Sequence, residues 1–423
     1  MYLSYLRLTD FRSYEVADLA LKPGVSVFLG PNGFGKTNLV EAVEFLATLG
    51  SHRVASDQPL IRAGRDAATV AGRVQAGIGD DRSLTVAVDI RAGAANRAQL
   101  NRAPVRPRDV IGAVRTVVFA PEDLAIVRGD PGGRRAFIDE LITSRWPRLA
   151  GVRAEYDRAL KQKTALLKAM SGRGSRQAGA GGEEALAVWG QTMAHLGAEI
   201  VAARLRTLTE LAPLVAADYD AIAPVSSAAS AVYHSSSIPA ATVAEVTLIE
   251  QLLNDQMSAR LGDETTRGVC LVGPHRDDIV FSLGDLPVKG YASHGEGWSY
   301  ALALRLASLE LLHDDGVEPI LILDDVFAEL DEHRRVRVVA AMESVEQTLI
   351  TAAVRRDLPT NLTAEVFLVS RGAVRSAGEL SDLSDGVEVD AASNGEIGPV
   401  SDETGVTGID TQPTTREAVE GER

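Results

Sequence analysis

The chain has 423 residues, of which 45% are apolar and 24% charged, so it is long enough for two or three domains and too apolar for a disordered polymer. Fifty-eight acidic residues against 43 basic ones give a net charge of −15, which by itself argues against a nucleic-acid-binding protein. The single cysteine, Cys270, excludes an intrachain disulfide, and no apolar run approaches the ~18 to 20 residues that span a bilayer. Since charged residues also interrupt the N-terminal stretch that would be apolar in a signal peptide, we expect a cytoplasmic protein.

The first thirty residues alternate between apolar and polar side chains, which predicts β-strands that end at Gly30. Residues 30–37, GPNGFGKT, then match the phosphate-binding pattern G-x-x-x-x-G-K-[ST], and apolar residues at helical spacing follow. In such a P-loop, glycines let backbone N–H groups turn toward phosphate oxygens at the positive end of a helix. Lys36 would place its charge on the β- and γ-phosphates, and the Thr37 hydroxyl would coordinate Mg²⁺. The sequence therefore predicts a site for ATP and Mg²⁺ that begins with Gly30, Pro31, Asn32, Gly33, Phe34, Gly35, Lys36, Thr37 and Asn38.

Strand-like segments at residues 69–74, 84–90 and 115–120 come next, and they overlap a basic part of the chain. Residues 91–176 contain 18 basic and 8 acidic residues. Such a segment can contact the phosphates of a DNA duplex without reading its sequence, and few aromatic residues are present to stack on single-stranded bases. Solvated helix faces, neutralised by nearby acids, would give the same composition. The candidate contacts are Arg97, Arg102, Arg106, Arg108, Arg128, Arg134, Arg135, Arg145, Arg148, Arg153, Arg158, Lys161, Lys163 and Lys168.

Helical patterns over residues 138–170 and 183–217, with a glycine-rich break between them, predict a helical hairpin. A weak Ser- and Ala-rich segment and then a helix over 243–261 follow it. Further helices are expected at 296–312 and 332–343, and strands at 269–272, 279–283, 320–323, 347–351 and 366–369.

Beyond Arg371 the apolar periodicity fades, and residues 375–423 carry 12 acids and 3 bases. We therefore divide the chain into an ATPase lobe made of residues 1–124 and 267–372, a helical insert lobe of residues 125–266, and a disordered acidic tail of residues 373–423.

ILILDD, residues 320–325, would complete the nucleotide site, because it is a buried strand that ends in two carboxylates. Asp324 is placed to hold Mg²⁺ through water, and Asp325 to orient or deprotonate the attacking water. Lys36 and Asp325 are thus the predicted catalytic residues, and Thr37 and Asp324 the predicted metal-binding ones. Two adjacent carboxylates repel each other unless a cation lies nearby, so a bound metal ion would explain why both acids stand here.

Three further motifs resemble those of ATP-binding-cassette ATPases. SHGEGW, residues 293–298, resembles the signature motif, whose Ser and Gly close on the γ-phosphate held by a second subunit; Ser293 and Gly295 match, and Glu296 replaces the usual Gln. AELDEHR, residues 328–334, resembles the D-loop. FAPEDL, residues 119–124, stands at the position of the Q-loop, but it has an acidic residue and lacks the usual Gln. Thr351 or Ala352 stands where many of these ATPases have a switch His.

Together with LTDFRSY, GKTNLVEAVEFL, SHR, LIRAG and GPHRDD, these motifs make residues 1–371 similar to the RecF family of bacterial recombination and repair ATPases, in the SMC/Rad50-like class. The resemblance implies an α/β, ABC-type P-loop ATPase head with a mixed sheet, flanking helices and a helical insert lobe. It implies an ATP-dependent homodimer that clamps DNA, with Arg12 and Ser13 near the adenine or ribose and Ser293 and Gly295 acting in trans.

The resemblance also implies a weak, DNA-dependent ATPase of recombinational repair, replication restart and the SOS response. Such a protein would bind gapped DNA or junctions of double and single strands. With RecO and RecR it would load RecA in place of single-strand-binding protein.

Other functions remain open on the residues alone. A transporter-type nucleotide-binding subunit would share the P-loop and signature helix but would need a membrane partner, and a Rad50-like subunit would need a far longer coiled coil. A small-molecule kinase would leave SHGEGW and AELDEHR without a role. In GPHRDD, one histidine and two acids are too few ligands for a metal site, so we expect a hydrogen-bonded turn, with Cys270 in the core.

Overall fold

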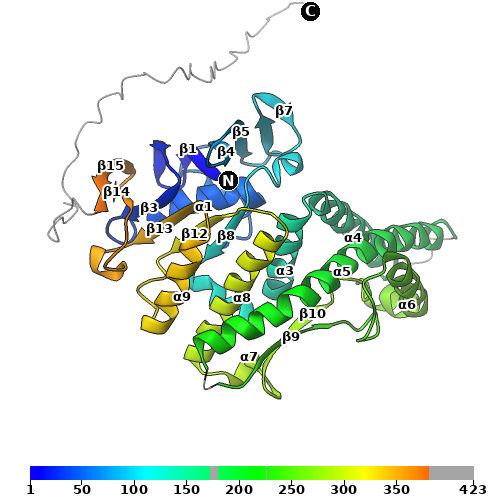
Figure 1. The fold of residues 1–423 in the computed structure, drawn as a ribbon. Coiled ribbons are helices and arrows are strands. Elements are labelled where there is room, and N and C mark those ends of the chain that lie inside the picture. Colours follow the sequence, from blue (N-terminus) through cyan, green and yellow to red (C-terminus); the bar gives the residue numbers. More distant parts are fainter. Residues whose placement is uncertain (172–179, 225, 381–423) are drawn as a thin grey trace, which may run out of the picture. The chain divides into compact units, whose positions relative to one another are not determined.

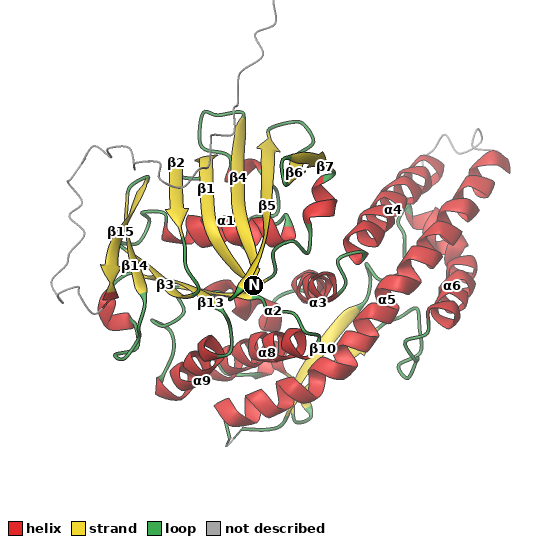
Figure 2. Cartoon of the chain, turned by 45° about the horizontal axis from the view of Figure 1, so that its top comes forward, coloured by secondary structure: helices red, strands yellow, loops and turns green. Residues whose placement is uncertain are grey.

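Two six-stranded sheets enclose helix α1 in this computed structural model, which describes residues 1–171, 180–224 and 226–380 (Figure 2). The elements of the first part are β1 (Tyr2–Phe11), β2 (Tyr14–Ala20), β3 (Gly24–Leu29), α1 (Lys36–Thr48), η1 (Gln58–Leu60), β4 (Ala67–Gly77), β5 (Asp80–Arg91), β6 (Arg97–Leu100), β7 (Ala103–Val105), η2 (Pro107–Val110), β8 (Thr116–Phe119), η3 (Pro121–Asp123), α2 (Leu124–Arg128) and α3 (Pro131–Arg145).

The elements that follow are α4 (Leu149–Ser171), α5 (Ala180–Ile222), β9 (Ala229–His234), α6 (Val246–Arg267), β10 (Asp278–Leu283), β11 (Leu286–Pro287), α7 (Val288–Tyr291), α8 (His294–Asp314), β12 (Ile320–Asp324), α9 (Glu332–Glu343), β13 (Gln347–Ala352), η5 (Arg355–Asp357), β14 (Glu365–Ser370) and β15 (Ala373–Glu379). None of the helices in the described ranges is both long and apolar enough to cross a membrane.

One of the two six-stranded sheets is mostly parallel, with the strand order β15-β14-β3-β13-β12-β8, and only β15 is antiparallel to its neighbour. Its strands are apolar on both faces, as expected of a sheet covered on both sides. On β12, Ile320 and Ile322 pack into the core around α1, whereas Leu321 and Leu323 face the core formed with the helices on the other side. The antiparallel sheet, β2-β1-β4-β5-β6-β7, covers the opposite side of α1.

The parallel register brings segments that are distant in the sequence to one edge. Asp324 is paired with Thr351, and Ala352 with Leu29, the last residue before the P-loop. Because parallel strands end at the same edge, the carboxyl ends of β3, β12 and β13 form one crevice at the start of α1.

Helix α5 packs against α4, α6 and α8, and therefore connects the helical part of the chain to the helix that follows SHGEGW (Figure 1). The small sheet β11-β10-β9 also contacts this helix.

The structure differs from the predictions in the helical region. The single helix expected over residues 138–170 is two helices, α3 and α4, separated at Trp146–Arg148. Pro147 lacks the N–H that a helix interior requires, and its ring conflicts with the preceding turn.

Three segments also differ from the predictions for strands: one expected strand does not form, and strands form in two segments where none was expected. Residues 269–272 form no strand, because side chains of Glu264, His275 and Arg276 take hydrogen bonds that a neighbouring strand would have made. The Ser- and Ala-rich segment contains β9, which pairs with β10. Residues 373–379, expected in the disordered tail, form β15, since Gly372 with φ +70° permits a tight turn back onto the edge of β14. Most of the glycine-rich break, residues 172–179, and the rest of the tail, residues 381–423, lie outside the described residues.

Candidate nucleotide-binding site

The P-loop connects β3 to α1, and two of its glycines are required by close contacts. A Cβ atom on Gly30 would lie 2.3 Å from the carbonyl oxygen of Val369 on β14. Gly35 has φ +106°, and a Cβ there would lie 2.6 Å from Oγ of Ser13. The N–H groups of Lys36 and Thr37 open α1 and have no partner within the helix, so this loop presents donors of the kind that bind phosphate.

Lys36 is 5% exposed and lies over the loop. Its Nζ donates hydrogen bonds to the carbonyl oxygen of Pro31 at 3.2 Å and to Oδ1 of Asn32 at 3.0 Å. Burial lowers the pKa of Lys36, while the charges of Asp325 and Asp324 act in the opposite direction. The ammonium group is therefore in the electrostatic range of both predicted carboxylates.

Asp324 connects the two halves of the site. Its Oδ1 accepts hydrogen bonds from the hydroxyl of Thr37 at 3.0 Å and from the hydroxyl of Thr351 at 2.6 Å. Burial raises the pKa of Asp324, and these two hydrogen bonds lower it in part. The fold thus places the two predicted metal-binding residues, Thr37 and Asp324, in direct contact although 287 positions separate them.

Asp325 has φ +53°, a conformation that costs a non-glycine residue of order 1 kcal/mol or more. Its backbone N–H donates to Oγ1 of Thr351 at 2.9 Å, which holds it in this conformation. Strain of this kind gathers at functional sites. The Thr351 hydroxyl thus contacts the carboxylate of Asp324 and the backbone of Asp325.

These residues fit a bound Mg²⁺. One hydroxyl and one carboxylate are adjacent, and Mg²⁺ usually takes only one or two protein ligands, with water and phosphate oxygens completing its shell. Nowhere in residues 1–171, 180–224 and 226–380 do three His, Cys, Asp or Glu side chains form a cage for a metal ion.

His52 is a site residue whose role the sequence did not predict. Glu44 of α1 accepts a hydrogen bond from the His52 backbone N–H at 3.1 Å and contacts Nδ1 at 2.6 Å. The other ring nitrogen, Nε2, lies 3.9 Å from Oδ2 of Asp324. Burial would lower the pKa of His52, but the hydrogen bond to Glu44 and the charges of Glu44, Asp324 and Glu122 outweigh it and raise this pKa to about 9. The only signal in the sequence was SHR, which resembled the family without suggesting a function.

Arg12 and Ser13 lie in the turn between β1 and β2, next to the P-loop. Oγ of Ser13 accepts a hydrogen bond from the Asn38 side chain at 2.9 Å. The guanidinium group of Arg12 is bound by the buried carboxylate of Glu41, with Nε to Oε2 at 2.9 Å, and by the carbonyl oxygen of Pro59. The structure therefore brings both predicted residues to the site, and it gives Arg12 a partner that the sequence did not indicate.

Ser293 and Gly295 lie at the start of α8. Ser293 caps this helix, its Oγ accepting from the Glu296 backbone N–H at 3.3 Å, while the Glu296 carboxylate accepts from the Ser293 N–H at 2.7 Å. This N–H lowers the pKa of Glu296, whose carboxylate is thus turned back onto the helix end. Arg334 of α9 donates to the carbonyl oxygen of Gly295 at 2.9 Å, which joins AELDEHR to the signature motif. Among the described residues, no hydrogen bond or ion pair connects Ser293 or Gly295 to the P-loop.

The segment after β8 is joined to the same helix by a buried ion pair. Arg305 of α8 donates through Nε at 3.1 Å and Nη2 at 2.6 Å to Oδ1 of Asp123. The neighbouring Glu122 is exposed, and its charge acts on His52 and Asp324. Asp123 is therefore structural, whereas Glu122 acts on the site through its charge.

GPHRDD is the predicted hydrogen-bonded turn. Nδ1 of His275 lies 2.7 Å from the hydroxyl of Tyr156, and burial lowers the pKa of His275 to about 4. Asp277 accepts from the hydroxyl of Tyr233, and Asp278 pairs with Arg134. Cys270 is buried in the core, as expected.

Comparisons with known proteins relate nearly the whole described chain to one family. The family described as RecF/RecN/SMC N terminal domain matches residues 2–371. The chain is 52% identical over 386 residues to the DNA replication and repair protein RecF of Cutibacterium acnes (strain DSM 16379 / KPA171202), covering 88% of this chain and 98% of that protein.

Solved structures show the same architecture. Two structures of the recombination mediator protein RecF in the RecFOR pathway, with ATP and with ATPrS, are 25% identical to the chain, with TM-scores of 0.79 and 0.78. They cover 89% of this chain, and the chain covers 97% and 98% of theirs. An Smc head domain from Pyrococcus furiosus, bound to the C-terminal domain of ScpA, is 16% identical over 90% of this chain and 96% of its own, with a TM-score of 0.50. The predicted fold class, an ABC-type ATPase head with mixed α/β structure, is confirmed.

Proposed function

The chain belongs to the RecF family, within the RecF/RecN/SMC N-terminal domain family, and from this we propose that it is an ATP-dependent, DNA-binding ATPase of recombinational DNA repair. The observation that carries the proposal is the contact of Thr37 with Asp324 beside the P-loop. A phosphate cradle, a hydroxyl and a carboxylate then meet at one point, as phosphoryl transfer from a nucleoside triphosphate requires.

Each residue has a separate role in this proposal. The N–H groups at the start of α1 bind the phosphates, and Lys36 places its charge on them. Thr37 and Asp324 hold Mg²⁺, which neutralises charge on the phosphate oxygens when bound. Asp325 orients the attacking water or accepts its proton, and the conformation imposed through Thr351 directs its side chain.

Two copies of the chain would complete each site. In the described part of the chain, Ser293 hydrogen-bonds with Glu296 of the same helix, and Gly295 accepts a hydrogen bond from Arg334 of α9. Ser293 is exposed and lies at the positive end of the α8 dipole. We propose that this helix end binds the γ-phosphate held by a second copy, so that ATP drives formation of a homodimer and the monomer turns over slowly.

The DNA contact would use only part of the basic segment. Arg134, Arg145 and Lys163 are each buried in ion pairs, with Asp278, with Asp315 and Glu210, and with Glu264. They maintain the fold and cannot reach a DNA phosphate. The alternative interpretation of the composition, neutralisation by nearby acids, therefore applies to these three.

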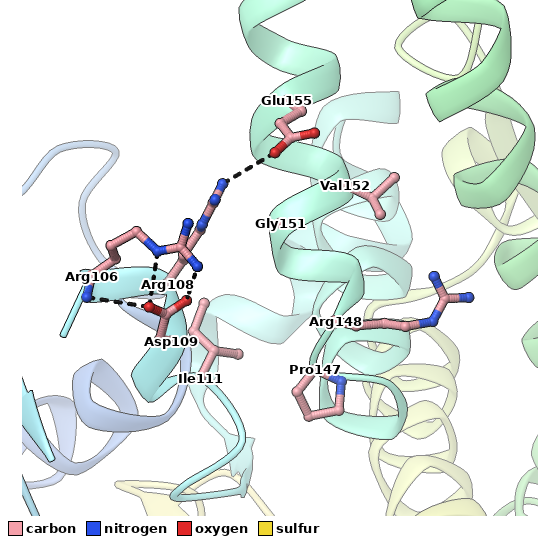
Figure 3. A pocket seen from close by; sticks show the side chains of 9 residues that line it. All are labelled: Arg106, Arg108, Asp109, Ile111, Pro147, Arg148, Gly151, Val152 and Glu155. Atoms are coloured by element: carbon pink, nitrogen blue, oxygen red, sulfur yellow. Dashed lines mark hydrogen bonds and ion pairs between the residues drawn. The ribbon is translucent and has the colours of Figure 1, made fainter.

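Other arginines of this segment line an open pocket of ≈ 470 Å³ between η2 and the start of α4 (Figure 3). Arg106 and Arg108 lie on one side and Arg148 on the other, and Arg106 and Arg148 are largely exposed. Asp109 and Glu155, the partners of Arg106 and Arg108, are 36% and 50% exposed, so a phosphate can replace them at low cost. Glu199, the partner of Arg148, is only 21% exposed, but the Arg148 side chain itself is 71% exposed and remains open to a phosphate. We propose this pocket as one point of contact with the backbone of duplex DNA.

We propose the wider role from the resemblance to the RecF family, whose members compared above are described as a DNA replication and repair protein and as a recombination mediator protein in the RecFOR pathway. The chain would act at gapped DNA or at junctions of double and single strands and, with RecO and RecR, load RecA in place of single-strand-binding protein, in the cytoplasm. Within the ranges proposed above, the ATPase lobe would be residues 1–124 and 267–372, the insert lobe residues 125–266, and the acidic tail would begin after β15.

Size-exclusion chromatography with light scattering tests the ATPase clamp. We expect the chain to shift from monomer to dimer with ATP and Mg²⁺, and to a dimer–DNA complex with a duplex. Lys36→Met should prevent ATP binding or hydrolysis. Ser293→Arg should bind a fluorescent ATP analogue normally and stay monomeric, because a long cation blocks the helix end. A Ser293→Arg variant that still dimerises on ATP would refute the assignment in trans.

A salt titration tests the DNA contact. Arg106→Glu/Arg148→Glu should weaken duplex binding about 10-fold or more at low salt and reduce its salt dependence, since each lost phosphate contact removes a released counterion. Arg82→Glu/Arg260→Glu changes two exposed arginines outside the pocket and shifts the net charge by the same amount, so it is the matched control. Equal loss in the control would mean that net charge, not the pocket, determines binding.

A further inference from the structure

His52 has one ring nitrogen whose hydrogen bonding is unexplained. The ring is nine-tenths buried, and its Nε2 has no hydrogen-bond partner within the described residues. A buried polar atom of this kind costs about 1 to 3 kcal/mol, so its retention at this place calls for a partner.

The ring cannot turn to find another partner. Both oxygens of the buried Glu44 are engaged with His52, one with its backbone N–H and one with Nδ1. Because Glu44 itself is fixed on α1, Nε2 stays directed toward Asp324.

Asp324 has a matching open atom. Its Oδ1 receives both hydroxyl groups, from Thr37 and Thr351, while Oδ2 lies 3.9 Å from Nε2 of His52. This distance is too long for a direct hydrogen bond. It is short enough for one water molecule to lie about 2.8 Å from each atom.

We infer that His52 is a positioning residue whose Nε2, together with Oδ2 of Asp324, holds one water molecule of the Mg²⁺ shell. The inference rests on the proposed function of the same site. The Thr37 hydroxyl, which donates a hydrogen bond to Oδ1 of the same carboxylate, marks where the ion binds. Magnesium keeps most of its waters, so the protein selects the ion by orienting those waters as well as by direct ligands.

This role accounts for two features of the site. By the resemblance, the segment after β8 has an exposed acid, Glu122, where cassette ATPases usually have a glutamine, and β13 has Thr351 or Ala352 where many have a histidine. A neutral or positive group that orients water must then come from elsewhere. The loop after α1 supplies it through His52, which lies among the carboxylates of Glu44, Glu122 and Asp324.

The test is the Mg²⁺ dependence of nucleotide binding, measured by fluorescence of a labelled ATP as Mg²⁺ is added. His52→Gln carries an amide group to the position of Nε2, whereas His52→Asn reaches only the position of Nδ1. We expect His52→Asn to raise the half-saturating Mg²⁺ concentration about 10-fold, and His52→Gln to stay within about 3-fold of wild type. In EDTA, all three proteins should bind the nucleotide equally.

Several results would overturn the inference. One is an unchanged Mg²⁺ requirement in His52→Asn, and another is an equal shift in His52→Gln, because the polar atom at Nε2 would then be irrelevant. If His52→Asn does not fold, His52→Met, which fills the space of the ring, takes its place with the same expectation. Thr37→Ala separates the two proposals. If the Mg²⁺ dependence is unchanged in Thr37→Ala as well as in His52→Asn, the proposed metal site is wrong. If the Mg²⁺ dependence changes in Thr37→Ala but not in His52→Asn, the metal site stands and only the role of His52 is wrong.

Discussion

We expect Asp123→Ala to destabilise the fold by about 3 kcal/mol, because it leaves the Arg305 guanidinium buried without its partner. The two side chains are 8% and 9% exposed, and Arg305 donates two hydrogen bonds to the carboxylate. Removal of one member of such a pair costs about 3 to 5 kcal/mol. The lower end of this range applies here, since the charge of Glu140 also acts on Arg305 and offsets part of the loss.

A double-mutant cycle isolates the pair. Asp123→Ala/Arg305→Leu removes both charges, so its cost should be smaller than the sum of the two single variants by about 2 kcal/mol. Urea unfolding, followed by circular dichroism, gives the three free energies. Arg260→Ala, which breaks an exposed ion pair on α6, is the control and should change stability by less than about 0.5 kcal/mol.

Additive effects within about 0.5 kcal/mol would refute the reasoning, because the two groups would then not depend on each other. The cycle also bears on function. Since Arg305 lies on the helix that begins with the signature motif, Asp123→Ala should weaken ATP-driven dimer formation more than it weakens ATP binding by the monomer.

Three further outcomes are expected. Burial lowers the pKa of His275 to about 4, so on acidification the unfolded chain binds a proton at this histidine before the folded chain does. The free energy of unfolding should therefore fall by about 3 kcal/mol as the pH drops from about 6.5 toward 4. Urea unfolding at each pH should show a weaker dependence of this free energy on pH in His275→Gln. Lys163→Met leaves the carboxylate of Glu264 buried without a partner and should lower the free energy of unfolding by about 3 to 5 kcal/mol. Lys163→Met/Glu264→Gln should recover much of this loss. A urea unfolding midpoint near that of wild type in Lys163→Met would contradict the prediction. Gly30→Ala places a Cβ atom against the Val369 carbonyl, so it should lower the free energy of unfolding by about 1 to 3 kcal/mol and impair ATP binding. A normal affinity for ATP would mean that β3 and β14 can move apart without disturbing the P-loop.

The amino-acid sequence by itself determined the local chemistry of this protein. GPNGFGKT and ILILDD depend on residue types at short spacing, and each motif needs only its own strand or helix to take the predicted form. The contact between Thr37 and Asp324 could also be anticipated, because parallel strands end at one edge of a sheet. The proline at position 147 indicated the break between α3 and α4, although Pro213 lies inside α5 without ending that helix.

Only the tertiary structure decided which charges serve the fold and which face solvent. Arg134, Arg145 and Lys163 belong to the basic segment by composition, yet their partners come from distant parts of the chain and are absent from any local pattern. His52 likewise gains its neighbour Asp324 from a strand some 270 positions away. Charge interactions depend on distance and burial in space, and neither is encoded in the spacing of residues along the chain.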